Sequence, residues 1–133
     1  MLVYTRKLRR PGRGGLVHAA LVRPLLRALR VPGRIKSPTY AVVEPYELPE
    51  QNLAIWHFDF YRFSDPREWE DAGFRDIFAS TGLKLAEWPQ NAGGLLPRAD
   101  LVIELEVQSD ESRRITLTAQ TATGETLLKE VPA

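Results

Sequence analysis

The stretch LAIWHFDFYRF, residues 53–63, has the alternation that is typical of a β-strand with two chemically different faces. Successive side chains of a strand point to opposite sides, so one face carries aromatic rings: Trp56, Phe58 and Phe60. The other face carries polar, titratable groups: His57, Asp59 and Tyr61. The aromatic face predicts contact with a core. The polar face predicts either one wall of a site or a half-exposed sheet, and the pattern favours neither.

Neighbouring segments also have the alternation or the short apolar run that predicts a strand. With the opening stretch they give strands at Leu2–Tyr4, Tyr40–Leu48, Leu53–Phe63, Leu83–Ala86, Leu101–Val107 and Arg113–Ala119. We expect the last two to form an antiparallel pair across the polar turn at residues 108–112.

Helices are predicted between these strands. Leu21–Leu29 has leucines at helical spacing, and its helix either starts near Arg23, with Pro24 in the first turn, or kinks at Pro24. SDPREWED, residues 64–71, opens a short helix that Ser64 or Asp65 can cap. Residues 125–131 predict a last strand or a short helix after a turn at 123–124. The length of 133 residues predicts one domain.

Basic residues are concentrated at the start of the chain. Residues 1–36 hold ten of the 18 Lys and Arg residues and none of the 17 Asp and Glu residues, so the remainder is acidic. Such an end is typical of phosphate or nucleic-acid binding, of an organelle transit peptide, or of a solvated face. Cysteine is absent, which excludes disulfides and thiolate metal sites. No apolar run reaches the ~18 residues of a membrane helix.

Two carboxylates are candidates for chemistry. Glu87 ends the predicted strand Leu83–Ala86, which is where open α/β sheets place functional residues, and in nucleotide-binding folds such a carboxylate holds Mg²⁺. Asp59 could orient water or a metal ligand, but the pattern favours a buried aspartate that pairs with Arg62 or a backbone amine. His57 and Asp59 are spaced as a metal pair, yet no third ligand is evident, which disfavours zinc.

Two loops have residues that suit phosphate binding. KSPTY, residues 36–40, offers a lysine and the hydroxyls of Ser37 and Thr39 before a strand, and it predicts either a contact with a γ-phosphate or a polar turn. RRPGRGGLVHAAL, residues 9–21, lies between a predicted strand and a predicted helix, where a phosphate-binding loop belongs. It has the glycines of such a loop but lacks its lysine and hydroxyl.

Taken in order, KSPTYAVVEPYEL, WHFDFYRFSDPREWEDAGFRDIF and LKLAEWPQNAGGLLPRADLVIEL resemble the bacterial TsaE (YjeE) family, from about Leu21 to the C-terminus. The resemblance implies one P-loop NTPase-like α/β domain over residues 1–133, in three layers with a mixed parallel and antiparallel sheet. It implies binding of ATP and Mg²⁺, slow ATP hydrolysis, and a cytoplasmic location. It also implies work with TsaD and TsaB, which place threonylcarbamoyl on an adenosine (t6A) of tRNA, so that tRNA is an indirect partner.

The resemblance also implies roles for particular residues. Glu87 would be the Mg²⁺ carboxylate, and Asp59, from the HFDFYR motif, the other catalytic carboxylate. Thr39 would belong to a switch-like loop that contacts nucleotide. Tyr61, Arg62 and Trp88 would complete this part of the nucleotide site.

Two departures from the family pattern concern the start of the chain. An N-terminal segment of the family is missing, so we expect the N-terminal part of the fold to be incomplete. The family loop, close to GDLGAGKTT, is replaced by residues 9–21. The candidate nucleotide-binding residues in this degenerate loop are Gly12, Gly14, Gly15 and His18. His18 stands where the family has lysine, and Ala19 where it has the Mg²⁺-binding hydroxyl, so we expect impaired ATP binding and leave enzymatic activity open.

The altered loop has the form of a codon frame slip. GDLGAG can be encoded by DNA that, with a C in front and read one base early, encodes RRPGRG, residues 9–14. A similar shift yields Val-His-Ala at 17–19 if one codon is added. We therefore hypothesise that about Arg9–Ala20 is an out-of-frame reading of an ancestral P-loop. A gene sequence whose alternative frame encodes no GDLGAGK-like peptide would rule this out.

Two other functions stay open from the sequence. A non-catalytic interaction module could keep the surface for its t6A partners without ATP chemistry. A basic nucleic-acid-binding protein could use residues 6–36, although no aromatic residues interleave with these arginines.

Overall fold

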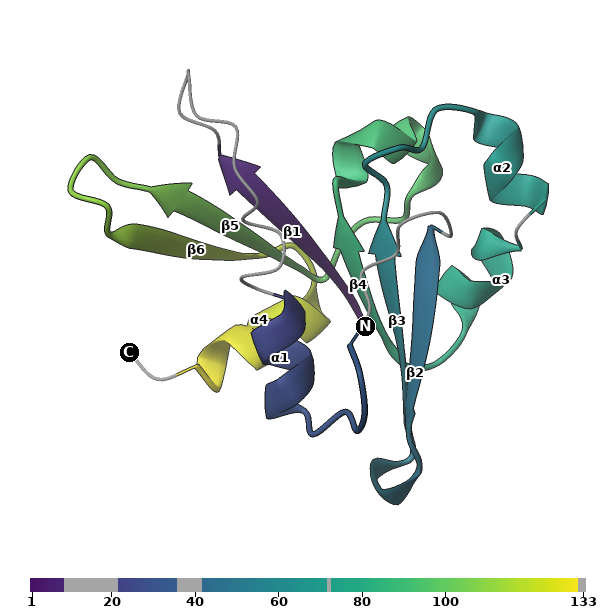
Figure 1. Cartoon of the computed structure of the whole chain (residues 1–133), viewed down its shortest axis with the longest axis horizontal. Coiled ribbons are helices and arrows are strands. Elements are labelled where there is room, and N and C mark those ends of the chain that lie inside the picture. Colours follow the sequence, from purple (N-terminus) through teal and green to yellow (C-terminus); the bar gives the residue numbers. More distant parts are fainter. Residues whose placement is uncertain (9–21, 36–41, 72, 132–133) are drawn as a thin grey trace.

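A six-stranded mixed sheet forms the centre of the fold (Figure 1), with strand order β2-β3-β4-β1-β5-β6. The computed structural model describes residues 1–8, 22–35, 42–71 and 73–131. Its strands are β1 Leu2–Leu8, β2 Val43–Leu48, β3 Leu53–Asp59, β4 Leu83–Glu87, β5 Leu101–Val107 and β6 Arg113–Ala119. Its helices are α1 Val22–Ala28, α2 Pro66–Asp71, α3 Phe74–Ala79 and α4 Ala122–Lys129, with short 3₁₀ segments η2 Pro49–Gln51 and η3 Pro89–Leu95.

The central strands are parallel and the outer strands are antiparallel to them. β1 pairs in parallel with β4 on one side and β5 on the other, and β3 pairs in parallel with β4. β2 and β6 close the two edges as antiparallel partners of β3 and β5. The four parallel strands therefore end at the same edge of the sheet, and the predicted mixed α/β sheet is confirmed.

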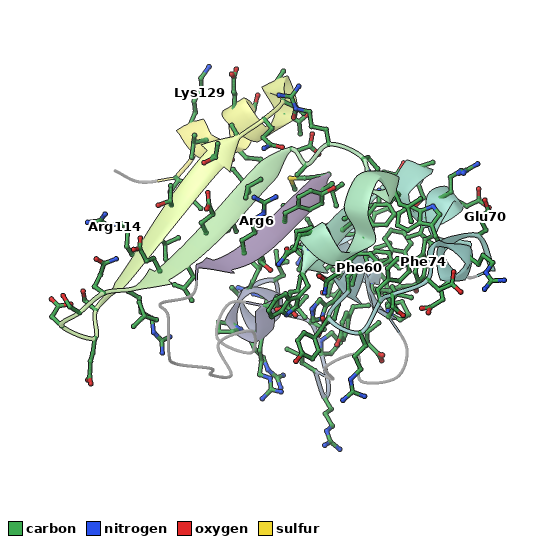
Figure 2. The ribbon with its side chains drawn as sticks, turned by 90° about the horizontal axis from the view of Figure 1, so that it is seen from above. Arg6, Phe60, Glu70, Phe74, Arg114 and Lys129 are labelled. Carbon is green, nitrogen blue, oxygen red and sulfur yellow. The ribbon has the colours of Figure 1, made fainter. Side chains whose placement is uncertain are left out.

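Two hydrophobic cores cover the two faces of the sheet, which gives the predicted three layers. On one face α1 contributes Val22 and Leu26, which pack with Val3, Ile55 and Leu85 of the strands. On the other face an aromatic cluster joins the sheet to α2 and α3; its largest members are Phe58, Phe60, Phe63, Trp69 and Phe74. Phe60 and Phe74 lie together in this crowded region beside the sheet (Figure 2), with ring centroids 6.3 Å apart.

The aromatic face predicted from the sequence is confirmed. Phe58 and Phe60 are both 0% exposed, and Trp56 packs against the same cluster while remaining partly exposed. The ring of Phe58 stacks on Phe78 of α3 at 4.6 Å between centroids. Aromatic pairs at such spacings add to the stabilisation that burial itself gives, so this cluster fixes the position of β3 against α2 and α3.

Several predicted boundaries differ from the structure. β1 continues from Tyr4 to Leu8, because β5 pairs with it along this whole length and supplies hydrogen-bond partners that allow polar residues inside a strand. β3 ends at Asp59 instead of residue 63, and β2 begins at Val43; residues 40 and 41 lie outside the described residues. The helix predicted to start near Arg23 is α1, with Pro24 in its first turn.

The end of the chain is a helix, so the predicted turn at residues 123–124 is wrong. α4 begins at Ala122 because the Thr121 side chain accepts a hydrogen bond from the Gly124 amide at 3.2 Å. The Asp65 carboxylate similarly accepts the Arg67 amide at 3.0 Å in the first turn of α2, as the capping prediction required. Of the two alternatives for residues 125–131, the short helix is correct.

Asp100 fastens the beginning of β1 to the beginning of α4. Its Oδ2 accepts the Leu2 amide at 2.8 Å, and its Oδ1 accepts the Thr121 hydroxyl at 2.6 Å. A Cβ at Gly124 would overlap the Asp100 carbonyl oxygen, so only glycine fits there. Burial alone would raise the pKa of Asp100, but the hydrogen bonds from Thr121 and Leu2 and the charge of Lys84 together hold it below its ordinary value.

Asp100→Asn removes this charge and replaces one acceptor oxygen by a donor. We expect the free energy of unfolding, measured with urea at pH 7, to fall by about 1.5–3 kcal/mol, the range for hydrogen bonds to charged groups. The folded pKa lies below the unfolded value of about 3.9. The charge-dependent stabilisation is therefore complete above the unfolded value and is lost as the pH falls through the folded pKa. The difference in the free energy of unfolding between the parent chain and Asp100→Asn should narrow below about pH 4.

Asp110→Asn, in the exposed turn between β5 and β6, is the matched control. Its carboxylate accepts only from Ser112, two residues away. We expect a change within about 0.5 kcal/mol. Equal losses of unfolding free energy in the two variants would contradict the role given to Asp100. So would a difference between Asp100→Asn and the parent chain that widens on acidification.

Candidate functional site

The candidate site lies at the edge of the sheet where the parallel strands end. Thr5 of β1 is in register with Glu87 of β4, and Glu87 is in register with Asp59 of β3. Residues in register on neighbouring strands share a face, so the three side chains line one face of the sheet at this edge. Ligands of open α/β sheets bind outside the carboxyl ends of strands, which makes this row the natural starting point for a site.

Glu87 is buried and contacts His57. Its Oε2 lies 3.2 Å from His57 Nε2, and the two side chains are 4% and 5% exposed. β4 delivers Glu87 as its last residue, so the predicted placement at a strand end is confirmed. A buried carboxylate needs a donor to replace its water shell, and His57 supplies one from the neighbouring strand.

Asp59 shapes the turn that follows β3. Its Oδ1 accepts the Tyr61 amide at 3.0 Å, and its side chain is half-buried. The sequence favoured an aspartate paired with Arg62 or a backbone amine. The backbone partner is present, whereas Arg62 is exposed and forms no ion pair with Asp59 within the part of the chain that the structure describes. The predicted Arg62 partner is therefore wrong, because the turn directs that side chain into solvent.

The rings of Tyr61 and Trp88 contact each other in the turns that follow β3 and β4, and Trp88 packs against the aromatic cluster. Their ring centroids are 5.1 Å apart with 55° between the ring planes, and Tyr61 is 57% exposed. Trp88 has the left-handed φ of 55°, which ends β4 abruptly after Glu87. The structure thus brings together four of the predicted site residues, Asp59, Tyr61, Glu87 and Trp88.

Backbone bonds join the turns after β3 and β4. The Phe60 amide donates to the Glu87 carbonyl at 3.0 Å. The Asn91 side chain donates to the carbonyls of Phe60 and Tyr61 at 3.1 and 3.2 Å. Asn91 was not predicted, because a lone asparagine after Pro89 and Gln90 carries no periodic signal. Thr5 was also missed, since the strand prediction stopped one residue before it.

Arg62, the other predicted site residue that the structure describes, is exposed. The remaining predicted site residues lie outside the described residues: Gly12, Gly14, Gly15 and His18 in residues 9–21, and Thr39 in residues 36–41. Their contribution to a site stays a prediction.

The donors at this edge are chemically suited to Mg²⁺. Asp59 and Glu87 provide carboxylates, and Thr5 provides a hydroxyl in a side chain that is buried. Mg²⁺ prefers oxygen ligands and is usually held by one or two carboxylates together with phosphate oxygens and water. Within the described residues no three His, Cys, Asp or Glu side chains gather closely enough to hold a metal. Asp59, Glu87 and Thr5 thus offer oxygen atoms of the kind that Mg²⁺ takes alongside phosphate oxygens and water.

The fold and this row of polar residues define an α/β protein whose candidate site lies at the carboxyl ends of parallel strands. A family model described as threonylcarbamoyl adenosine biosynthesis protein TsaE matches residues 12–115. The chain therefore belongs to the TsaE family.

Individual relatives agree with the family model. The tRNA threonylcarbamoyladenosine biosynthesis protein TsaE of Haemophilus influenzae is 38% identical over 114 residues, which cover 86% of this chain and 70% of that protein. The protein of the same name from Bacillus subtilis is 34% identical over 85 residues, covering 64% of this chain and 51% of that protein. A crystal structure of Bacillus subtilis YdiB shares the fold, with a TM-score of 0.69 at 22% identity over 97% of this chain and 74% of that one.

Two substitutions at Asp59 test its structural role, which is to accept the hydrogen bond from the Tyr61 amide. Asp59→Asn keeps an acceptor oxygen for the Tyr61 amide, so we expect the free energy of unfolding to stay within about 0.5 kcal/mol. Asp59→Ala removes the acceptor and should cost about 1 kcal/mol. Urea denaturation checks both values. Equal stability of the Asn and Ala variants would show that this hydrogen bond does not hold the turn.

Proposed function

We propose that this protein acts in the biosynthesis of threonylcarbamoyladenosine in tRNA, in the cytoplasm, together with TsaD and TsaB homologues. The observation that carries the proposal is the TsaE family match over residues 12–115, supported by the relatives that bear this name. No helix in the described ranges is long and apolar enough to span a membrane. tRNA is then an indirect partner, which the protein complex modifies.

In the same proposal, a nucleotide binds at the edge of the sheet where the parallel strands end. Glu87 would hold Mg²⁺, directly or through water, and Asp59 would orient a water or the metal. Tyr61, Arg62 and Trp88 would border the nucleotide, and Thr39 would approach its terminal phosphate. Bound Mg²⁺ would neutralise charge on the phosphate oxygens. The row formed by Thr5, Glu87 and Asp59 supports this assignment, because three neighbouring strands present oxygen donors there.

Residues 9–21 weaken the phosphate-binding half of this site. A P-loop needs a lysine beside the β- and γ-phosphates and a hydroxyl on Mg²⁺. His18 is shorter than lysine and mostly neutral near pH 7, and Ala19 has no ligand atom. Val17 adds a side chain where the family has glycine and the backbone must approach phosphate. The chain as written should therefore keep the carboxylates of the site while binding ATP weakly.

Calorimetry with Mg-ATP tests this division. We expect no binding by the chain as written at micromolar ATP, and micromolar affinity after residues 9–20 are replaced by a GDLGAGKT loop. In the restored chain Glu87→Gln should weaken Mg-ATP binding by about tenfold or more, the effect of losing one good charged contact. Glu47→Gln is the control, because Glu47 is exposed on β2 opposite Ala54, near the other end of β3. Micromolar affinity of the unaltered chain for Mg-ATP would overturn the conclusion that residues 9–21 weaken ATP binding.

Cells that lack their own TsaE test the biological role. We expect the loop-restored chain to return t6A to tRNA, measured by mass spectrometry of tRNA nucleosides, because the family match extends over residues 12–115 and the carboxylates of the proposed site are in place. The chain as written should copurify with TsaD and TsaB without returning t6A, as expected of a non-catalytic module. Failure of the restored chain both to copurify and to return t6A would contradict the proposed function.

A further inference from the structure

His57 is buried at the carboxyl edge of the sheet, and the nucleotide chemistry proposed above gives it no task. It is 4% exposed, in a strand that otherwise presents Ile55 and Asp59 on the same face. Burial of an imidazole in a strand is costly unless its nitrogens find partners. Among the described residues, its side chain contacts the carboxylate of Glu87.

The sheet register makes this contact informative. Glu87 lies in register with Asp59, whereas His57 lies in register with Leu85, two residues before Glu87. The two side chains span this offset, and Glu87 Oε2 lies 3.2 Å from His57 Nε2. The contact gives one oxygen of the carboxylate a partner on the neighbouring strand.

The hydrogen positions follow from the chemistry of the two groups. An ionised carboxylate only accepts hydrogen bonds, so an ionised Glu87 requires the hydrogen on His57 Nε2, which then donates. Nδ1 of the same ring is buried without a hydrogen-bond partner among the described residues. The geometry is that of a histidine held by packing with one nitrogen aimed at a carboxylate. Hydrogen-bonded partners of this kind orient the groups that bind metals in other sites.

We propose that His57 is a positioning residue, whose Nε2–H fixes the Glu87 carboxylate so that nucleotide binding becomes dependent on Mg²⁺. The inference rests on the proposed function, which makes Glu87 the Mg²⁺ carboxylate. His57 acts through Glu87 and touches neither metal nor nucleotide. Its loss should therefore weaken the effect of Mg²⁺ on ATP affinity while leaving the affinity for metal-free ATP unchanged.

Two substitutions in the loop-restored chain test the proposal by calorimetry with ATP, once with Mg²⁺ and once with EDTA. His57→Leu keeps apolar volume but removes the donor, and it should reduce the gain in affinity that Mg²⁺ gives by about tenfold or more, the effect of losing an outer partner of a metal ligand. His57→Gln keeps an N–H donor with similar reach and should retain most of that gain. The affinity in EDTA should be the same for both variants and the parent.

Each result has a definite meaning. The positioning role would be overturned if Mg²⁺ raised the ATP affinity of His57→Leu as much as that of the parent. It would also be overturned if the Leu and Gln variants lost this Mg²⁺-dependent gain in affinity equally. Equal weakening with Mg²⁺ and with EDTA would indicate general damage to the fold and would also overturn it. A restored parent whose affinity is the same with Mg²⁺ and with EDTA would instead refute the metal role of Glu87 in the proposed function.

Nitrogen NMR of the unaltered chain tests the contact independently of any nucleotide. We expect the His57 ring to show a hydrogen on Nε2, with signals assigned by their loss in His57→Gln, since the chain has two histidines. Glu87→Gln should shift the Nε2 signal because the acceptor loses its charge. A neutral ring with its hydrogen on Nδ1, or signals unmoved by Glu87→Gln, would show that His57 does not hold this carboxylate.

Discussion

The parallel pairing of β3, β4 and β1 is the constraint on which the candidate site depends. It brings Asp59, Glu87 and Thr5, which are far apart in the sequence, into one row at the edge where these strands end. A shift of one residue in either pairing would turn one carboxylate to the aromatic face. The register is fixed by the two cores, because Ile55 and Leu85 must face α1 while Phe58 and Ala86 must face the aromatic cluster.

Different parts of the molecule stabilise the two halves of the site. The half formed by β3 and β4 is held by the aromatic cluster, by the Phe60–Glu87 backbone bond and by Asn91, all within the described residues. β1 is held between two strands and fastened at its beginning by Asp100. The supports named here all come from described residues, so the frame-slip hypothesis does not require them to change.

The sequence predicted features that depend on local periodicity and missed those that depend on neighbouring strands. The pair β5 and β6 was predicted residue for residue, because its alternation is regular and its turn is polar. The aromatic face of β3 and the position of Glu87 followed from the same reasoning. The extension of β1 through Thr5, the Asn91 bridge and the His57–Glu87 contact could not be read from periodicity, since each requires knowledge of which strands are adjacent. Thr121 was not predicted as a helix cap, because Gly124, three residues later, suggested a turn.

The central claim is that the row of Thr5, Glu87 and Asp59 is the metal-binding half of a nucleotide site whose loop has changed. A crystal structure of the loop-restored chain with Mg²⁺ and a non-hydrolysable ATP analogue tests it most directly. We expect Mg²⁺ beside Glu87, either at about 2.1 Å or through one water, with His57 Nε2 still bonded to the same carboxylate. A nucleotide bound away from the carboxyl edge of β4, or Mg²⁺ held without Glu87 or its bound water, would contradict the account.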